Sequence, residues 1–417
     1  MRVCVVGGGA REHALAHVLS RTAEVVTTPG NPGIEGSVST PPEEIDADLY
    51  VIGPEEPLVH GLAYRLRAQG RTVLGPGSDG AQLEGSKAWM KEFANRHGIP
   101  TAAHRVFDDV DLAVAALRDS RGPWVIKTDG LAAGKGVLVT ESVAAAEDDV
   151  RDKLSGRSFG DAGRKVVVEE YLDGPEISVL AVCDGKRAVA LAPAQDFKRV
   201  GDGDSGPNTG GMGAYSPVPF VSKDLLEEIE ETFLRRAIEG MVSDGIDYRG
   251  ILYTGLALTS RGPKLVEFNI RFGDPEAEVV LPRFESDLAA LLYQAASGRI
   301  EEEPRFVDEA AVVVVAASPG YPGPATTGHP IHGVDEAAGV DGVTVFHAGT
   351  ERSRDGQLVS AGGRVLAVSG MGADLPAARK RAYDGMSRIT FEGMQYRRDI
   401  AARYDAPGDG ASSDTVE

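Results

Sequence analysis

Short apolar runs alternate with helix-like stretches through the first hundred residues, and no other feature of the sequence constrains the fold as strongly. The apolar runs cover residues 2–6, 49–52 and 72–74, and the helical patterns cover 11–19 and 58–69. Strands joined through helices pair in parallel, because each crossover returns the chain to the same edge of the sheet. We therefore predict a Rossmann-like parallel α/β domain over residues 1–85.

The remainder of this 417-residue chain is too long for one hydrophobic core, so further domains are expected. A helix starting after Ser86 opens a predicted core over 86–305, and β-rich runs within about 122–190 form a smaller lid subdomain. A β-rich domain is expected over 306–405, followed by a tail at 406–417 whose Gly, Ser, Asp and Pro predict disorder. The predicted fold class is multidomain, of α/β and α+β type.

The composition limits the compartment and the partners. Formal net charge is −20, whereas nucleic-acid binding requires a positive surface, so no nucleic-acid partner is expected. No segment approaches the roughly 18 apolar residues of a membrane span, and the first strand starts at once, which leaves no room for a signal peptide. The two cysteines, Cys4 and Cys183, lie in hydrophobic runs and favour a reducing compartment. We expect a soluble cytoplasmic protein without a membrane partner.

Two lysines and three glycines occur between Lys127 and Gly136, at a junction between two predicted strands. Glycines let backbone N–H groups approach phosphate oxygens, and lysines supply the opposite charge. The spacing differs from that of a Walker A loop, since three residues separate Gly130 from Gly134 and glycine follows Lys135. On this stretch alone, a phosphate site and a flexible hairpin with solvated lysines fit the sequence equally well.

Two glutamates end a strand whose apolar residues predict that it is buried. Glu169 and Glu170 close this strand, and Glu176 follows in the next segment. A strand that runs into a loop can pair its backbone with an adenine, and a carboxylate can accept hydrogen bonds from ribose hydroxyls. The alternative is a strand that ends in charged surface residues, and the spacing does not decide between the two.

Glu267, Asn269 and Arg271 alternate with apolar residues, so they share one face of a predicted strand. A carboxylate and an amide oxygen suit Mg²⁺, which takes few protein ligands and fills its shell with water and phosphate oxygens. Arg271 is placed to stabilise negative charge on a transferring phosphoryl or acyl group. A solvated polar face is the alternative, but the tight Gly-Asp-Pro turn at 273–275 favours a functional site.

Lys87 is predicted to lie in the first turn of a helix. A cation at this position opposes the helix dipole unless an anion binds, and an ordinary surface lysine is the alternative.

The loop from Gly7 to Gly9 can hold a phosphate at the start of the next helix. Glu12 stands where a dinucleotide-binding fold needs glycine or alanine, so NAD binding is disfavoured. His13 is interpreted as a structural helix residue. The segment 196–216 is predicted to be a long irregular functional loop.

The order of these features resembles the ATP-grasp superfamily: a first-turn lysine, a lysine strand with a glycine loop, a Glu-Glu-aromatic-Leu hinge and Glu-x-Asn-x-Arg. From Met1 to about Tyr404 the chain more closely resembles the phosphoribosylamine–glycine ligase family. The motifs that carry this resemblance are GGGAREH, PGNPG, GPEEPLV, QLEGSK, KTDGLAAGKGV, GPNTGGMGAYSP, VEFNIRFGDPE, HAGT and GGRVL. It implies an ATP-grasp fold, with the Rossmann-like domain before it and the β-rich domain after it.

The resemblance also implies a reaction. Glycine is joined to 5-phospho-β-D-ribosylamine with ATP and Mg²⁺ or Mn²⁺, giving glycinamide ribonucleotide, ADP and phosphate in purine biosynthesis. A glycyl phosphate forms first, because a carboxylate is a poor electrophile until one oxygen becomes a leaving group. The expected partners are these small molecules, and the expected state is a monomer or weak dimer. The alternatives are another ATP-grasp carboxylate–amine ligase and a non-catalytic nucleotide-binding regulator.

By the same resemblance, residues take roles from the motif positions that they occupy. Nucleotide binding falls to Lys87, Lys127, Gly130, Gly134, Gly136, Glu169, Glu170, Leu172 and Glu176. The metal falls to Glu267 and Asn269, and catalysis to Arg271, Lys135 and Asp196. Substrate binding falls to Gly7, Gly8, Gly9, Lys198, Asn208, Thr209, Gly210, Gly211, Met212, Gly213 and Arg271.

The chain departs from the family pattern at two places. Phe197 stands where the family tends to have histidine, so no proton transfer is assigned to this position. The segment between Gly36 and Asp48 is shorter than expected, which concerns the edge of the N-terminal sheet rather than the nucleotide site.

Overall fold

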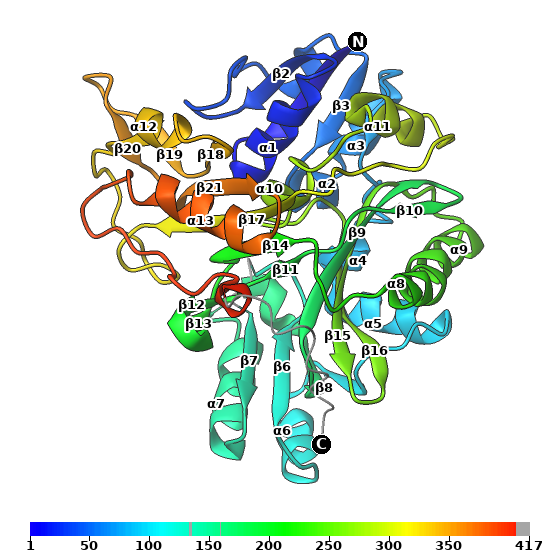
Figure 1. Ribbon diagram of the computed structural model, residues 1–417. Coiled ribbons are helices and arrows are strands. Elements are labelled where there is room, and N and C mark those ends of the chain that lie inside the picture. The colour runs from blue at the N-terminus through cyan, green and yellow to red at the C-terminus, as the bar shows by residue number, and fades with distance from the viewer. Residues whose placement is uncertain (133–135, 159, 406–417) are drawn as a thin grey trace.

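The computed structural model describes residues 1–132, 136–158 and 160–405, and their strands form four sheets of four or five strands and two two-stranded ladders. In Figure 1 the N-terminal sheet lies at the top, the C-terminal sheet on the left, and a small sheet with two helices at the bottom. None of the helices in the described parts of the chain combines the length and apolarity needed to span a bilayer.

The N-terminal sheet is entirely parallel, with strand order β2-β1-β3-β4. Its elements are β1 (Arg2–Gly7), α1 (Ala10–Leu19), β2 (Glu24–Pro29), η1 (Pro42–Glu44), β3 (Leu49–Ile52), α2 (Glu55–Val59), α3 (Leu62–Ala68) and β4 (Val73–Leu74). Every residue of β3 is buried, as expected for a strand covered on both faces. The predicted parallel sheet is confirmed, and the connection from β2 to β3 contains just the short 3-10 helix η1.

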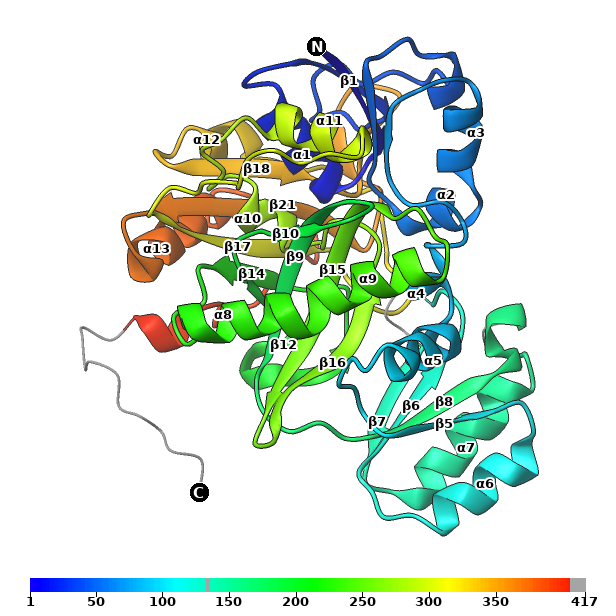
Figure 2. The ribbon, with the colours of Figure 1, turned by 90° about the vertical axis from the view of Figure 1, so that its right-hand side faces the viewer.

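The lid sheet is antiparallel, with strand order β5-β8-β6-β7. Its elements are β5 (His104–Phe107), α6 (Val110–Arg118), β6 (Trp124–Thr128), β7 (Val137–Thr140), α7 (Val143–Leu154), η2 (Gly160–Arg164) and β8 (Val166–Glu170). Helices α6 and α7 pack on the face that carries Ile126 and Val168 (Figure 2). Because side chains alternate along a strand, Lys127 and Glu169 point to the opposite face.

The central sheet is also antiparallel, with strand order β10-β9-β15-β16. Its elements are α4 (Gln82–Gly85), α5 (Lys87–Arg96), β9 (Glu176–Asp184), β10 (Ala188–Ala190), α8 (Lys223–Ile229), α9 (Arg236–Ser243), β15 (Arg249–Thr259), β16 (Gly262–Asn269) and α11 (Leu288–Ala296). A π-helical turn, η4 (Glu230–Arg235), joins α8 to α9, and Figure 2 shows this long helix crossing the sheet. Residues of β9 alternate between two cores, so Val179 packs with α8 and α9 whereas Leu180 packs with α11.

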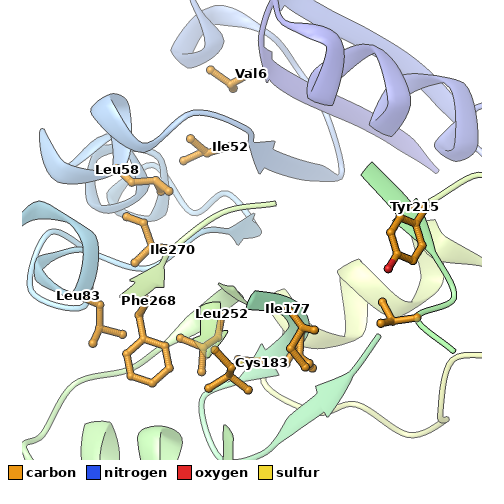
Figure 3. Packing of buried hydrophobic residues seen from close by; sticks show 14 of the residues in the cluster. Val6, Ile52, Leu58, Leu83, Ile177, Cys183, Tyr215, Leu252, Phe268 and Ile270 are labelled. Carbon is orange, nitrogen blue, oxygen red and sulfur yellow. The ribbon is translucent and has the colours of Figure 1, made fainter. Parts of the chain in front are cut away.

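One hydrophobic cluster joins the central sheet to the N-terminal domain. Figure 3 shows Val6, Ile52 and Leu58 of that domain in the same cluster as Phe268 and Ile270 at the end of β16. All five side chains are buried. The exit of β16, which carries the predicted metal ligands, is therefore fixed against the N-terminal domain.

The C-terminal sheet has five strands in the order β11-β14-β17-β21-β18. The elements of this region are β11 (Gln195–Asp196), β12 (Arg199–Gly201), η3 (Asp202–Asp204), β13 (Ser205–Asn208), β14 (Gly213–Ser216), α10 (Ala277–Val280), β17 (Ala310–Ala317), α12 (Val334–Ala338), β18 (Val343–His347), β19 (Thr350–Arg352), β20 (Leu358–Ser360), β21 (Arg364–Gly372), α13 (Leu375–Met386) and η5 (Ala402–Tyr404). The prediction of an irregular loop over 196–216 is wrong, because β11 and β14 join this sheet and β12 and β13 form a hairpin. Gly213 enters β14 opposite β17, where a Cβ would lie 2.6 Å from the Val313 carbonyl oxygen.

Candidate active site

A cavity of about 410 Å³ lies between the lid sheet, the central sheet and the start of β21. The predicted residues that line it are Lys87, Lys127, Gly130, Gly136, Glu169, Glu170, Leu172, Glu176, Asp196, Lys198, Asn208, Thr209, Gly210, Glu267, Asn269 and Arg271. Those outside its lining are Gly7, Gly8, Gly9, Gly211, Met212 and Gly213. Gly134 and Lys135 fall outside the described residues.

Lys127 and Glu169 reach the cavity from the neighbouring strands β6 and β8. Lys127 Nζ lies 3.0 Å from Glu169 Oε2 and donates to the Val266 carbonyl oxygen at 3.1 Å. Lys91 of α5, which was not predicted, approaches the same Oε2 at 2.9 Å. Burial works to raise the pKa of Glu169, but Lys127 and Lys91 outweigh it and hold the pKa below its ordinary value. One oxygen of the Glu169 carboxylate is thus paired within the protein, and the Glu169 backbone lies inside the sheet, between β5 and β6.

The carboxylate of Glu170 is likewise engaged by the protein. It accepts hydrogen bonds from Lys264 at 2.5 Å, from the Ala103 amide at 3.0 Å and from Arg261 at 3.2 Å. Burial pushes its pKa upward, but these three partners together hold the pKa at about 2. Beyond this strand end the chain continues into Leu172, which lines the cavity.

The start of α5 carries Lys87 next to an anion that the protein itself supplies. The Asp129 carboxylate accepts hydrogen bonds from the Ser86 hydroxyl at 2.9 Å and from the Ala88 amide at 2.8 Å. Asp129 belongs to the lysine- and glycine-rich stretch, so the lid loop is tied directly to this helix start. The Asp129 carboxylate interacts favourably with the positive end of the helix dipole, and it therefore compensates for the unfavourable position of Lys87.

Glu267 and Asn269 form the predicted metal-binding pair at the end of β16. Lys87 Nζ lies 3.4 Å from Glu267 Oε2, and the Asn269 amide nitrogen donates to Glu267 Oε1 at 3.4 Å. Burial would raise the pKa of Glu267, but the nearby cations Lys87, Lys198 and Lys127 outweigh it and lower the pKa to about 2. The carboxylate is therefore ionised near neutral pH. Within the described ranges no cluster of three or more His, Cys, Asp or Glu side chains is placed to hold a metal.

Arg271 leaves β16 between two carboxylates that the sequence analysis did not single out. Its guanidinium donates to Glu84 at 2.8 Å and lies 3.3 Å from Glu55. The second oxygen of Glu84 accepts the Ile270 amide at 2.9 Å. Burial lowers the pKa of Arg271, but Glu84 and Glu55 more than reverse this effect and raise it. The position of Arg271 is consequently fixed by the N-terminal domain and α4.

A second set of ion pairs lines the cavity beside the turn at 208–210. Lys198 Nζ contacts both oxygens of Asp196, at 2.9 and 3.1 Å. Arg364, the first residue of β21, donates to the Gly210 carbonyl at 2.8 Å and lies 3.0 Å from the Asp274 carboxylate. The C-terminal sheet therefore contributes a cation to the cavity, and it holds the turn in place.

The Gly7–Gly9 loop lies outside the cavity lining, beside a contact that we term the histidine junction, formed by His13, Asn31 and His347. The Asn31 side-chain amide donates to the Gly8 carbonyl at 3.0 Å and to the His347 carbonyl at 2.9 Å. The His347 amide donates to Nδ1 of His13 at 2.9 Å. The Gly9 amide donates to Glu12 at 2.7 Å, so the anion at the start of α1 is internal. Burial lowers the pKa of His13 to about 3 and that of His347 to about 4, which keeps both rings neutral.

The residues that sequence reasoning missed share one property: each acts through a partner distant in the chain. The most important are Glu55, Glu84, Lys91, Asp274 and Arg364. Four of them lie inside the motifs quoted above, so those motifs already included residues of the site that were given no role. Periodicity alone gives no such signal, because these side chains meet their partners only when distant parts of the chain pack together.

Comparisons with known proteins cover nearly the whole chain. The phosphoribosylglycinamide synthetase N domain matches residues 1–84, its ATP-grasp (A) domain matches 85–277, and its C domain matches 311–403. The phosphoribosylamine–glycine ligase of Caulobacter vibrioides is 48% identical over 97% of this chain and 98% of its own length. The ligase of the same name from Escherichia coli O157:H7 is 45% identical, over 97% and 98% respectively.

Solved structures give the same picture at the level of the fold. The phosphoribosylamine–glycine ligase of Thermotoga maritima is 35% identical with a TM-score of 0.87, and the match covers 96% of this chain and 100% of that one. The biotin carboxylase domain of Hydrogenobacter thermophilus 2-oxoglutarate carboxylase is 17% identical with a TM-score of 0.73, covering 95% and 91%. The second likeness concerns the fold alone.

Proposed function

The chain belongs to the phosphoribosylglycinamide synthetase family, and on this premise we propose that it uses ATP to join glycine to 5-phospho-β-D-ribosylamine. The products are glycinamide ribonucleotide, ADP and phosphate, in a step of purine biosynthesis. The observation that carries the proposal is the convergence of Lys87, Lys127, Glu267, Asn269 and Arg271 on one cavity of about 410 Å³. A cavity of this size suits small-molecule ligands.

In this proposal ATP lies between the lid sheet and the central sheet. Lys87 and Lys127 face the phosphates, together with Gly130 and Gly136 of the glycine-rich stretch. Gly134 and Lys135 keep their predicted roles from the sequence, since they fall outside the described residues. The base lies at the end of β8, against Glu169, Glu170 and Leu172, and Glu176 meets the ribose. Support comes from the cavity lining, which includes all four residues.

Glu267 and Asn269 have the chemistry that Mg²⁺ or Mn²⁺ requires. The ionised Glu267 and the amide oxygen of Asn269 supply two hard donors, and this small number suits a metal that also binds phosphate oxygens and water. When bound, such a metal offsets the negative charge of the transferring phosphoryl group. The Hydrogenobacter thermophilus domain of the same fold was solved with MgADP and bicarbonate.

The two remaining substrates take the side of the cavity formed by Asp196, Lys198, residues 208–210 and Arg271, and residues 211–213 support this turn from outside the lining. A glycine carboxylate oxygen attacks the γ-phosphorus and ADP departs, giving glycyl phosphate. The amine of phosphoribosylamine then attacks the carbonyl carbon, loses a proton and displaces phosphate. Arg271, held by Glu84 and Glu55, faces the negative charge that develops in both steps. The Gly7–Gly9 loop contacts the sugar phosphate in this proposal, since it ends a parallel strand at the carboxyl edge of its sheet.

We also infer a division of the chain at about residues 85 and 305, and a monomer or weak dimer in the cytoplasm. The buried free cysteines Cys4 and Cys183 suit a reducing compartment. The C-terminal sheet takes β11 and β14 from the preceding part, so the last two domains are interleaved rather than simply consecutive.

ADP release by the purified chain tests the reaction. With ATP, Mg²⁺, glycine and freshly formed phosphoribosylamine, we expect ADP and glycinamide ribonucleotide in equal amounts, and little ADP when either substrate is omitted. Turnover that requires a different amine acceptor would assign the chain to another ligation. ATP binding without ADP formation in any combination would identify a nucleotide-binding protein that is not a ligase.

A further inference from the structure

Lys91 is a fully buried lysine that takes no part in the proposed reaction as described so far. Its side chain is 0% exposed, and it does not line the cavity. It lies one helical turn after Lys87 on α5, so the two lysines share one side of the helix. Its ammonium group approaches Glu169 at 2.9 Å and donates to the Thr101 hydroxyl at 2.8 Å. A buried lysine is costly unless it is paired, so its position calls for an explanation.

The partner of Lys91 is shared with a residue of the cavity. Glu169 Oε2 lies 2.9 Å from Lys91 Nζ and 3.0 Å from Lys127 Nζ. The Glu169 side chain is 3% exposed and that of Lys127 is 5% exposed, so water contributes little screening at this contact. Two ammonium groups and one carboxylate leave a net charge of +1. Lys127 is the cation of this triad that lines the cavity.

Without Lys91 the net charge of this group of side chains would be zero instead of +1. Glu169 and Lys127 would then form a neutral buried pair, and the Lys127 ammonium would be held by one unshared carboxylate as well as by the Val266 carbonyl. Phosphate oxygens would meet a cation whose charge is already compensated. With Lys91 present, the carboxylate charge is divided between two cations.

We propose that Lys91 is a positioning residue for nucleotide binding, which neutralises Glu169 so that Lys127 keeps a positive charge for the phosphates of ATP. This inference rests on the proposed ATP site. Burial lowers the pKa of Lys91 to about 8 against the opposing effect of Glu169, which leaves the group mostly protonated at neutral pH. The triad also links α5 with β8 of the lid sheet, so the charge is delivered at a fixed place.

A double-mutant cycle between Lys91 and Glu169 tests the proposal. Lys91→Met should weaken ATP binding about tenfold, with the KM for glycine changed by less than about twofold. Lys91→Met combined with Glu169→Gln should recover most of the lost affinity, because the amide no longer compensates Lys127. Lys91→Arg, which keeps the charge, should bind ATP nearly as well as the wild-type chain. The dissociation constant is measured by displacement of a fluorescent ATP analogue, and KM values by ADP release.

Lys153 provides the matched control. It is also buried and paired, with Asp149 on α7, but it lies outside the cavity lining. Lys153→Met should lower thermal stability and leave ATP binding unchanged. The proposal is overturned if Lys91→Met lowers stability without weakening ATP binding. It is also overturned if the double variant binds ATP no better than Lys91→Met, or if Lys91→Arg binds ATP as weakly as Lys91→Met. Because ATP binding is measured without turnover, a wild-type chain that binds ATP but makes no product would contradict the proposed reaction and not this inference.

Discussion

The cavity and the histidine junction are both rich in motif residues, but the polar groups of the cavity are charged and those of the junction are neutral. In the cavity, Lys87, Lys127 and Glu267 are charged and retain capacity for further partners. In the junction, the Asn31 side chain donates to the Gly8 and His347 carbonyls, and the neutral His13 ring accepts the His347 amide. The charged groups of the cavity can bind ligands, whereas the neutral groups of the junction hydrogen-bond within the protein and hold its N-terminal and C-terminal domains together. Variants in the two regions should therefore fail in opposite ways.

The largest effect is expected in the cavity, at Glu267. Glu267→Gln removes the ionised donor and should reduce kcat by about 100- to 1,000-fold, a range typical for loss of one group that stabilises charge in a transition state. The variant should still fold, because the amide keeps the shape of the side chain, although it loses the stabilising charge of the carboxylate. Steady-state ADP release at several Mg²⁺ concentrations measures the loss. Wild-type rates in a folded variant would remove Glu267 from the metal site.

The junction should show the reverse behaviour. Asn31→Ala deletes three hydrogen bonds at a residue that is 8% exposed, and it leaves two carbonyl groups without this donor and the Gly33 amide without this acceptor. We expect a loss of about 2 to 4 kcal/mol in the free energy of unfolding. Urea denaturation measures this loss, and ATP affinity should remain that of the wild-type chain. A stable variant with weakened ATP binding would contradict the separation of the two regions.

Acid should weaken the junction before it affects Glu267 in the cavity. Above the ordinary histidine pKa of 6.5 both rings are neutral in the folded and unfolded chain. Below it the unfolded chain binds protons that the folded junction excludes, until the pH reaches the folded values of about 4 for His347 and about 3 for His13. From pH 7 to pH 5 each ring should therefore cost about 2 kcal/mol of stability. Glu267, whose pKa is lowered to about 2 from an ordinary 4.5, loses its contribution only as the pH falls below 4.5 toward 2.

The control for this pH dependence is His13→Asn. The asparagine side-chain oxygen can still accept the His347 amide, but it does not titrate. The decline in unfolding free energy between pH 7 and pH 5 should then be smaller by about 2 kcal/mol, the share of one ring. An unchanged decline would show that other groups dominate the acid response.

The smallest effect is expected at the exposed rim of the cavity. Arg261, whose side chain is 62% exposed, pairs with Glu170 at 3.2 Å, while Lys264 holds the same carboxylate at 2.5 Å. Arg261→Ala should change stability by less than about 0.5 kcal/mol and the KM for ATP by less than about twofold, since exposed ion pairs contribute little. Thermal melts and ADP release check both values. A large rise in KM would show that this rim takes part in binding the base.

Sequence patterns predicted the local elements well, because apolar periodicity directly reports burial. The alternation of Glu267 and Asn269 with apolar residues correctly placed both on one face of a strand. The partners that Arg271 and Glu169 find in Glu84 and Lys91 could not be predicted, since they become neighbours only when helices from other parts of the chain dock. The five-stranded sheet could not be predicted for the same reason. Strands β11 and β14 are short, and β14 joins the sheet by pairing with β17, which is distant in the chain.

The central claim is that glycine is activated through its own carboxylate within the cavity. Glycine labelled with ¹⁸O in both carboxylate oxygens tests this most directly, in a reaction with ATP and phosphoribosylamine analysed by mass spectrometry of the phosphate. A glycyl phosphate intermediate requires that one labelled oxygen leaves with each phosphate and that the other remains in glycinamide ribonucleotide. Phosphate without label, formed together with the ligated product, would contradict the account.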